Sequence, residues 1–200
     1  MPVLGITGGI ATGKSLVAST LAGLLGGVHV DLDSVGHRIL SSQESVRVQL
    51  ERELGPGVLG GDPVQERQRI RELVFRDPLK LRVLEAVLHP EIRRDWEGLA
   101  AEFRKKPGWL CLEIPLLFEV AAEAQFNRIV VAACSPEVQR SRLLENRGLS
   151  AETADKIRAS QLELGVKIQR GDHVIWNDST KTAVDRQCAL LAGWLKAVYG

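Results

Sequence analysis

Five short apolar runs of β-forming residues alternate along the chain with stretches in which apolar residues recur at helical spacing. The first run ends in glycines and is followed closely by a helical pattern over residues 15–25. The five predicted strands cover residues 3–6, 28–32, 109–114, 128–133 and 173–176. Continuous apolar strands separated by helices are typical of a parallel sheet covered on both faces, so the pattern predicts an α/β fold.

The stretch between the second and third predicted strands is too long for a single crossover helix. Residues 36–107 contain no convincing strand and much helical patterning, most clearly over residues 79–88. A crossover needs only about a dozen residues, and structureless connections much longer than this are uncommon. We therefore predict a helical insertion over residues 36–107 that forms a wall of the substrate site.

A second helical segment, residues 135–171, is rich in charged residues of both signs. Two interpretations of this pattern stay open. The segment is either a solvated pair of helices or a mobile lid that closes over the site.

The composition is that of an ordinary globular protein with one buried core and a modest insertion, because 44% of the 200 residues are hydrophobic and 26% are charged. The 26 basic residues almost cancel the 25 acidic ones. No uniform field is therefore expected that would hold a nucleic acid or an anionic membrane. Any phosphate binding has to be local.

The sequence shows no sign of export or membrane insertion. It starts with MPVLGITGG, which lacks a basic region followed by an apolar signal core, and no apolar run approaches the roughly 18 to 20 residues that span a bilayer. Three widely spaced cysteines without CxxC pairing fit reduced thiols in a protein core better than metal ligands: Cys111, Cys134 and Cys188. We expect a cytoplasmic protein.

Residues 8–15, Gly-Gly-Ile-Ala-Thr-Gly-Lys-Ser, fit the phosphate-loop pattern G-x-x-x-x-G-K-[ST] in full. Glycines are required because the backbone has to curl until successive N–H groups point at phosphate oxygens. Lys14 brings a positive charge to the β- and γ-phosphates, the helix that begins near Gly13 adds its partial positive end, and Ser15 is positioned to ligate Mg²⁺. The predicted ATP contacts are Gly8, Gly9, Ala11, Thr12, Gly13, Lys14, Ser15 and Leu16.

Two aspartates stand at the end of the second predicted strand, where ligands of a parallel sheet bind. Alternation along an extended chain would point Asp31 and Asp33 to one face, with Leu32 on the other. A kinase needs a group that orients or deprotonates the acceptor hydroxyl beside the phosphate loop. Either aspartate could instead only cap the following helix.

The third predicted strand ends in an acid followed closely by a proline. Pro115 stops the strand and makes the exit loop rigid. Glu113 could hold Mg²⁺ or its water shell beside Ser15. On spacing alone, Glu113 and Glu119 are explained as well by a role as loop or cap residues as by a role in the active site.

These motifs, taken in order, resemble the dephospho-CoA kinase family nearly from end to end. Many unrelated ATPases share the phosphate loop, so the specificity comes from the ordered set and above all from its Pro-Leu-Leu-Phe-Glu and Gly-Leu-Ser stretches. The matching segments are residues 5–15, Asp31-Leu32-Asp33, Gly36-His37, His89-Pro90, residues 114–119, Arg142-Leu143-Leu144, Gly148-Leu149-Ser150, Gln161 and Asn177.

The resemblance implies transfer of the ATP γ-phosphate to the ribose 3′-hydroxyl of dephospho-CoA, which gives coenzyme A and ADP and completes coenzyme A biosynthesis. It implies a three-layer P-loop fold with a five-stranded parallel sheet. The nucleotide-binding core would comprise residues 1–35, 108–134 and 172–200, with a helical CoA-binding domain over 36–107 and a lid over 135–171. A monomer or a weak homo-oligomer is expected.

The resemblance also implies roles for individual residues. Asp33 would accept or orient the proton of the acceptor, and Arg142 or Arg147 would act from the lid on the transferred phosphate. Asn177 would lie on the adenine side of ATP. The other substrate contacts would come from Asp31, His89, Pro115 and Leu116.

Three positions depart from the family pattern: Arg147 stands one residue after the usual arginine, Glu113 replaces a common aspartate, and Asp178 stands where glycine is usual. Two other functions stay open. One is a different P-loop kinase acting on a nucleoside or nucleoside monophosphate, and the other is a non-catalytic nucleotide-binding module, which Asp33 and the candidate lid argue against. A regulatory GTPase is disfavoured because the guanine-reading Asn-Lys-x-Asp sequence is absent.

Overall fold

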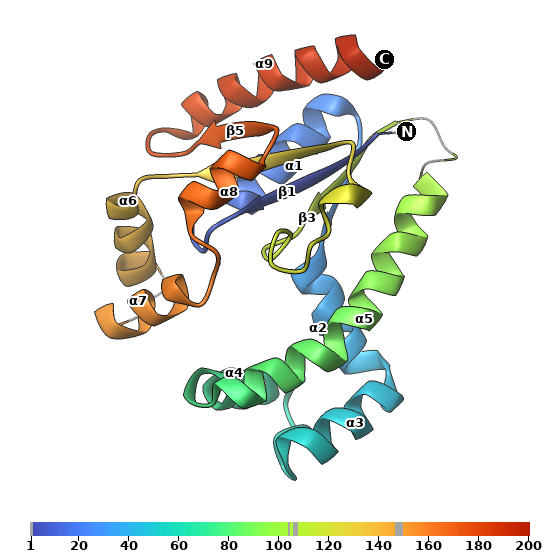
Figure 1. The fold of residues 1–200 in the computed structure, drawn as a ribbon, viewed down its shortest axis with the longest axis vertical. Coiled ribbons are helices and arrows are strands. Elements are labelled where there is room, and N and C mark those ends of the chain that lie inside the picture. The colour runs from blue at the N-terminus through green and yellow to red at the C-terminus, as the bar shows by residue number, and fades with distance from the viewer. Residues whose placement is uncertain (1, 104, 106–107, 147–149) are drawn as a thin grey trace. The chain divides into compact units, whose positions relative to one another are not determined.

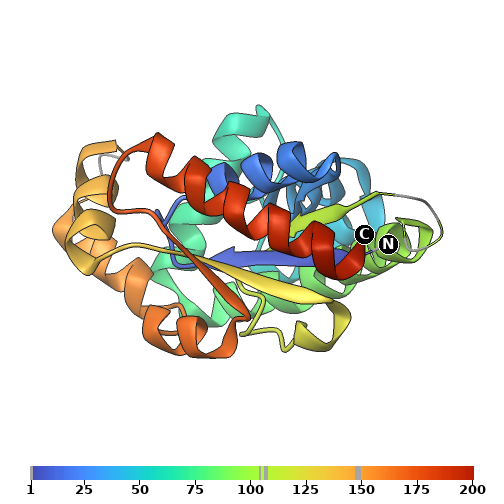
Figure 2. The ribbon, with the colours of Figure 1, turned by 90° about the horizontal axis from the view of Figure 1, so that it is seen from above.

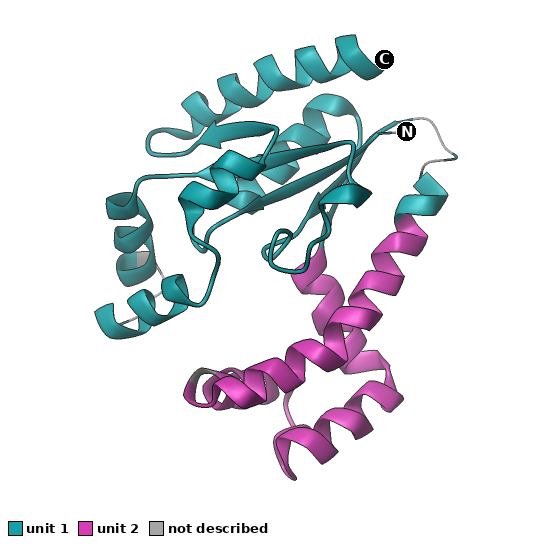
Figure 3. Ribbon diagram, viewed as in Figure 1, with its two compact units in different colours: residues 1–31, 100–200 teal, residues 32–99 magenta. Residues whose placement is uncertain are grey.

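The structure is a computed structural model that describes residues 2–103, 105, 108–146 and 150–200. The chain forms two compact units (Figure 3). Unit 1 consists of Met1–Asp31 and Ala100–Gly200, and unit 2 consists of Leu32–Leu99. The predicted insertion overlaps unit 2 but begins and ends a few residues later, and residues 135–171 belong to unit 1.

Unit 1 contains a five-stranded parallel sheet, which confirms the predicted α/β class. The strand order is β2-β3-β1-β4-β5, so β1 is central. Because the strands are parallel, their carboxyl ends meet at one edge of the sheet, where such folds bind ligands. The strands are β1 (Val3–Gly8), β2 (Val28–Asp31), β3 (Leu110–Glu113), β4 (Arg128–Ala133) and β5 (His173–Trp176).

The observed bounds of β4 and β5 agree with the prediction, β3 is one residue shorter at each end, and β1 and β2 end at other residues than predicted. β1 continues two residues beyond the predicted end and stops at Gly8. β2 stops at Asp31, because Leu32 already begins helix α2 (Leu32–Ser42). The prediction that Asp31 and Asp33 point to one face of a strand is therefore wrong, since Asp33 lies in the first turn of α2.

Helices cover both faces of the sheet in unit 1 and give three layers (Figures 1 and 2). On one face, α1 (Lys14–Leu25) and α9 (Lys181–Tyr199) pack together, and α8 (Leu164–Arg170) covers β4 on the other face. A short 3₁₀ helix, η1 (Glu123–Gln125), precedes β4. The segment after β4 comprises α6 (Pro136–Ser141), the π-helical turn η2 (Arg142–Asn146) and α7 (Ala151–Ala159).

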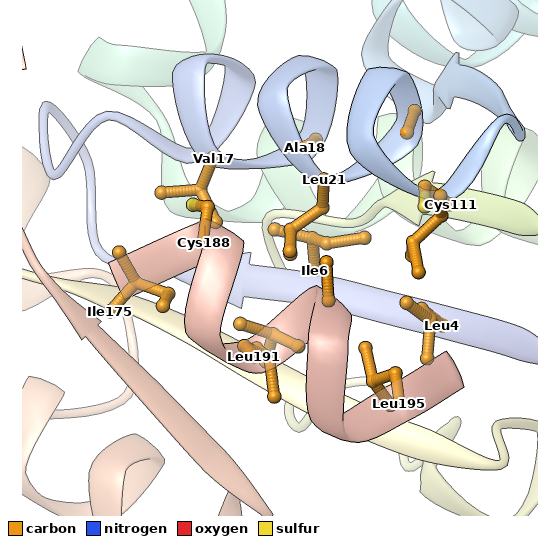
Figure 4. Packing of buried hydrophobic residues seen from close by; sticks show 14 of the residues in the cluster. Leu4, Ile6, Val17, Ala18, Leu21, Cys111, Ile175, Cys188, Leu191 and Leu195 are labelled. Atoms are coloured by element: carbon orange, nitrogen blue, oxygen red, sulfur yellow. The ribbon is translucent and has the colours of Figure 1, made fainter. Parts of the chain in front are cut away.

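The hydrophobic core of unit 1 lies between the sheet and the pair α1 and α9 (Figure 4). Leu4 and Ile6 point into it from β1, and Leu21 and Leu195 meet them from the two helices. All four side chains are fully buried, and burial of each contributes roughly 1.5 to 3 kcal/mol. This packing fixes β1 against α1 and thereby holds both ends of the loop that joins them.

The three cysteines are buried residues of the core with free thiols, as predicted. Burial raises the pKa of Cys111 to about 12 and the pKa of Cys188 to about 11. Both thiols therefore stay protonated and unreactive at neutral pH.

Unit 2 is built from helices: α2, α3 (Glu44–Leu54), α4 (Pro63–Arg76) and the larger part of α5 (Pro78–Phe103). Glu66 of α4 is nearly buried and accepts hydrogen bonds of 3.1 and 2.9 Å from both terminal nitrogens of Arg47, which joins α4 to α3. The Arg47 hydrogen bonds lower the pKa of Glu66, so this pair stays ionised at neutral pH. In the described part of the chain, no helix has the length and apolar character needed to cross a membrane.

Candidate nucleotide site

The loop between β1 and α1 curls because three of its residues have positive φ angles. These are Gly8 at 153°, Ala11 at 59° and Gly13 at 90°. Two are glycines, for which this region is accessible without steric cost, whereas Ala11 is a non-glycine residue in the left-handed region. Gly13 is also the N-cap of α1, so the partial positive end of that helix lies at the loop. The geometry is that of the predicted phosphate loop.

Side chains of the loop bind back to its own first turn. The Thr12 hydroxyl donates to the Gly9 carbonyl at 2.9 Å, and Thr12 is completely buried. The Lys14 ammonium donates to the same carbonyl at 3.0 Å. The lysine charge is thus held across the loop, where the oxygens of a bound phosphate could replace the carbonyl as its partner.

Glu113, at the end of β3, is nearly buried and joins α1 to β2 through its two oxygens. Its Oε1 accepts a hydrogen bond from the Ser15 hydroxyl at 2.8 Å, and its Oε2 lies 3.1 Å from His29 Nε2. Asp31 is the register partner of Glu113 on β2. The prediction named Ser15 and Glu113 as a possible metal pair without showing that they touch, and it missed His29.

The oxygen atoms of Ser15 and Glu113 fit Mg²⁺ by their chemistry, because Mg²⁺ prefers hard oxygen ligands and binds through one or two protein groups, substrate phosphates and water. Among the described residues, no group of three or more His, Cys, Asp or Glu side chains is able to hold a metal alone. A Mg²⁺ ion at Ser15 and Glu113 would therefore depend on phosphate oxygens for its other ligands.

Asn177, directly after β5, forms hydrogen bonds both to the phosphate loop and to Arg142 of the segment 135–171. Its side-chain amide donates to the Thr12 carbonyl at 2.9 Å. Arg142 Nη2 donates to the backbone carbonyl of Asn177 at 2.8 Å, and Arg142 Nη1 donates to the carbonyl of Ala11 at 3.4 Å. A methyl group at Gly13 would overlap the Asn177 amide. The predicted residues Asn177 and Arg142 thus lie directly against the loop.

The peptide groups of Ile10 are held by two glutamines from the same segment. Its N–H donates to Gln161 Oε1 at 2.9 Å, and its carbonyl accepts from Gln139 Nε2 at 2.7 Å. Gln139 in turn accepts from Arg158 Nε at 3.1 Å, which brings a further guanidinium close to the loop. Gln161 was among the residues that match the family pattern. Gln139 and Arg158 were not predicted as site residues, because nothing in the sequence distinguishes them from the other polar residues of a charged helical segment.

A completely buried lysine in α8 connects the start of the loop to the exit of β3. Lys167 Nζ forms an ion pair with Glu119 at 2.7 Å and donates to the carbonyl of Pro115 at 3.1 Å and that of Gly8 at 3.4 Å. Glu119 also accepts from the N–H of Leu162 at 2.9 Å. Glu119, which spacing left open, therefore has a structural partner, and Lys167 was missed.

The other predicted site residues fall into three groups. Pro115 and Leu116 follow β3 in unit 1, with Pro115 bonded as described. Asp33 and His89 belong to unit 2, in the first turn of α2 and within α5. Arg147 lies outside the described residues, together with the two residues that follow it.

A parallel sheet whose central strand leads through this loop into a helix defines the class of P-loop nucleotide-binding proteins. The crystal structure of TT1252 from Thermus thermophilus has the same fold, with a TM-score of 0.77 and 32% identity over 100% of this chain and 98% of that one. Residues 2–183 match the family described as dephospho-CoA kinase.

Two relatives named dephospho-CoA kinase resemble this protein over nearly their whole length. The enzyme of Thermosynechococcus vestitus is 37% identical to this chain, and the match covers 92% of this chain and 90% of the relative. The enzyme of Symbiobacterium thermophilum is 34% identical, and the match covers 100% of this chain and 83% of the relative. The chain belongs to the dephospho-CoA kinase family, which confirms the resemblance seen in its motifs. Membership in a P-loop kinase family implies use of ATP.

We expect Gly13→Ala to weaken ADP binding by about 5- to 150-fold, because an alanine at this φ angle and so close to Asn177 forces the loop out of shape at a cost of about 1 to 3 kcal/mol. Gly23→Ala is the matched control. Gly23 lies exposed in α1 with open space around it, so the exchange stabilises the helix by roughly 0.5 to 1 kcal/mol and leaves binding unchanged. Calorimetric ADP titrations and thermal unfolding of both variants test this, and equal ADP affinities would contradict it.

Proposed function

We propose that this protein transfers the γ-phosphate of ATP to the ribose 3′-hydroxyl of dephospho-CoA and releases coenzyme A and ADP, the last step of coenzyme A biosynthesis. The observation that carries the proposal is a complete phosphate loop, with Lys14 and Ser15 in place, in a chain that belongs to the dephospho-CoA kinase family. We place the activity in the cytoplasm, in a monomer or a weak homo-oligomer.

In this proposal ATP is held mainly by backbone groups and one ammonium. The loop N–H groups of residues 11–16 and the N-terminus of α1 bind the phosphates, and Lys14 neutralises the γ-phosphate as charge develops on it. Ser15 and Glu113 would hold Mg²⁺, which supplies further neutralisation of the phosphate charge when bound. Asn177, whose side-chain amide donates to the Thr12 carbonyl, would lie on the adenine side of ATP.

The segment 135–171 acts as a lid in this proposal. Arg142 already bonds to the loop through Ala11, and lid closure would direct Arg142 or Arg147 to the transferred phosphate and exclude water. Residues 36–107 form the CoA-binding wall. Asp31, His89, Pro115 and Leu116 would contribute the remaining substrate contacts.

Asp33 is the proposed acceptor of the proton of the ribose 3′-hydroxyl. Along the chain it follows the last residue of β2 by two positions, and β2 ends at the edge of a parallel sheet where ligands bind. In a loose phosphoryl-transfer transition state the nucleophile needs alignment more than complete deprotonation, so a carboxylate with an ordinary low pKa is sufficient. The alternative for Asp33 is a stabilising charge in the first turn of α2.

We expect Lys14→Ala to leave the fold intact and to lower kcat about 10²- to 10³-fold, because a preorganised positive charge at the transferred phosphate is lost. Lys196→Ala, at an exposed lysine of α9, is the control and keeps full activity. A coupled ADP-release assay with dephospho-CoA, nucleosides and nucleoside monophosphates measures both variants and the acceptor preference. A folded Lys14→Ala protein with normal turnover, or a preference for a nucleoside, would refute the proposal.

We expect Asp33→Asn to lower kcat about 10²- to 10⁴-fold, the usual contribution of a positioned acid–base group, while ATP affinity changes little. Asp31→Asn is the matched variant and is milder if Asp31 only supports the site. Steady-state kinetics with dephospho-CoA and calorimetric ATP titrations measure both effects. If Asp31→Asn were inactive and Asp33→Asn close to wild type, the two roles would have to be exchanged.

A further inference from the structure

His29 of β2 is connected to the phosphate-loop serine Ser15 through the carboxylate of Glu113. Its register partner on β3 is Cys111, and Glu113 follows two residues later, so the side chains of His29 and Glu113 lie on the same face of the sheet. The His29 side chain is 24% exposed and that of Glu113 only 6%. The imidazole therefore reaches from the rim of the sheet to a carboxylate that water hardly contacts.

The two oxygens of Glu113 are divided between two donors. The Ser15 hydroxyl occupies Oε1 and His29 Nε2 occupies Oε2. A carboxylate withdrawn from water needs hydrogen bonds to both oxygens, because desolvation of an unpaired charge is costly. With both donors in place, the Glu113 side chain has one orientation, and His29 supplies one of the two hydrogen bonds that fix it.

The direction of the Ser15 hydrogen bond has a chemical consequence. An ionised carboxylate only accepts hydrogen bonds, so the Ser15 hydroxyl is the donor. Once its proton points to Glu113, the oxygen lone pairs of Ser15 point elsewhere and are available to a cation. The orientation of the hydroxyl thus depends on the position of Glu113, and the position of Glu113 depends on His29.

We propose that His29 is a positioning residue for metal-dependent nucleotide binding: through Glu113 it orients the Ser15 hydroxyl toward the Mg²⁺ of a bound Mg-nucleotide. This inference rests on the proposed use of Mg²⁺ at Ser15. The role requires only a proton on Nε2, which one neutral tautomer and the imidazolium ion both carry. His29 touches neither nucleotide nor acceptor in this role.

Groups that orient metal ligands in this way typically contribute about 10- to 100-fold to metal affinity. We therefore expect His29→Phe, which keeps a ring but removes the donor, to raise the Mg²⁺ concentration needed for half-maximal enhancement of ADP binding by about 10- to 100-fold. ADP affinity in EDTA stays unchanged, because Lys14 and the loop amides hold the phosphates without the metal. His29→Gln places an amide N–H near the position of Nε2 and restores most of the Mg²⁺ affinity.

The experiment is a series of calorimetric ADP titrations at increasing Mg²⁺ concentrations and in EDTA, on wild type, His29→Phe and His29→Gln, with the fold checked by circular dichroism. If His29→Phe does not fold, His29→Leu carries the same comparison. Unchanged Mg²⁺ dependence in the variant without the donor would overturn the inference. So would equal losses in His29→Phe and His29→Gln, or a loss of ADP affinity in EDTA, since these indicate a packing role.

The titrations contain no acceptor, so the inference and the proposed function fail in different experiments. A wild-type protein that binds Mg-ADP but does not phosphorylate dephospho-CoA would refute the proposed function and leave the role of His29 supported by its own result. A wild-type protein that phosphorylates dephospho-CoA, together with a His29→Phe variant whose Mg²⁺ dependence equals that of wild type, would support the proposed function and refute the role of His29.

Discussion

The structure of unit 1 depends on one constraint: the chain has to leave the central strand β1 in a tight curl and still satisfy the polar backbone groups of that curl. Positive φ angles at Gly8, Ala11 and Gly13 produce the curl. Partners for its backbone groups then come from the loop itself and from distant segments, with Thr12 at the Gly9 carbonyl, glutamines at Ile10 and Asn177 at the Thr12 carbonyl. Unpaired backbone groups would be costly, so these partners preserve the loop for a nucleotide.

Lys167 and Glu113 are buried charged residues beside the loop, and their charges are compensated in different ways. Lys167 forms an ion pair with Glu119 and donates hydrogen bonds to the backbone carbonyls of Gly8 and Pro115. It therefore links α8 to the start of the phosphate loop and to the segment that follows β3. Glu113 accepts hydrogen bonds from Ser15 at the start of α1 and from His29 of β2. Removal of one partner of a buried charge is strongly destabilising, so both charges restrict how the elements around the loop can move.

Local sequence patterns were sufficient for the strands and for the phosphate loop, because strand periodicity and the glycine spacing act over a few residues. β4 and β5 begin and end where their apolar runs do. The strand geometry at Asp33 was wrong because helix α2 starts earlier than the apolar run ends. His29, Gln139 and Lys167 could not be predicted, since their importance arises from partners up to 159 residues away along the chain.

The proposed function is tested most directly by the position of the new phosphate in the product. The protein is incubated with ATP, Mg²⁺ and dephospho-CoA, and the purified product is examined by phosphorus–proton correlation NMR. The proposed function predicts a new phosphate coupled to the ribose 3′ proton, formed at a rate that Lys14→Ala lowers about 10²- to 10³-fold. A phosphate coupled to any other position, or ATP hydrolysis with dephospho-CoA unchanged, would contradict it.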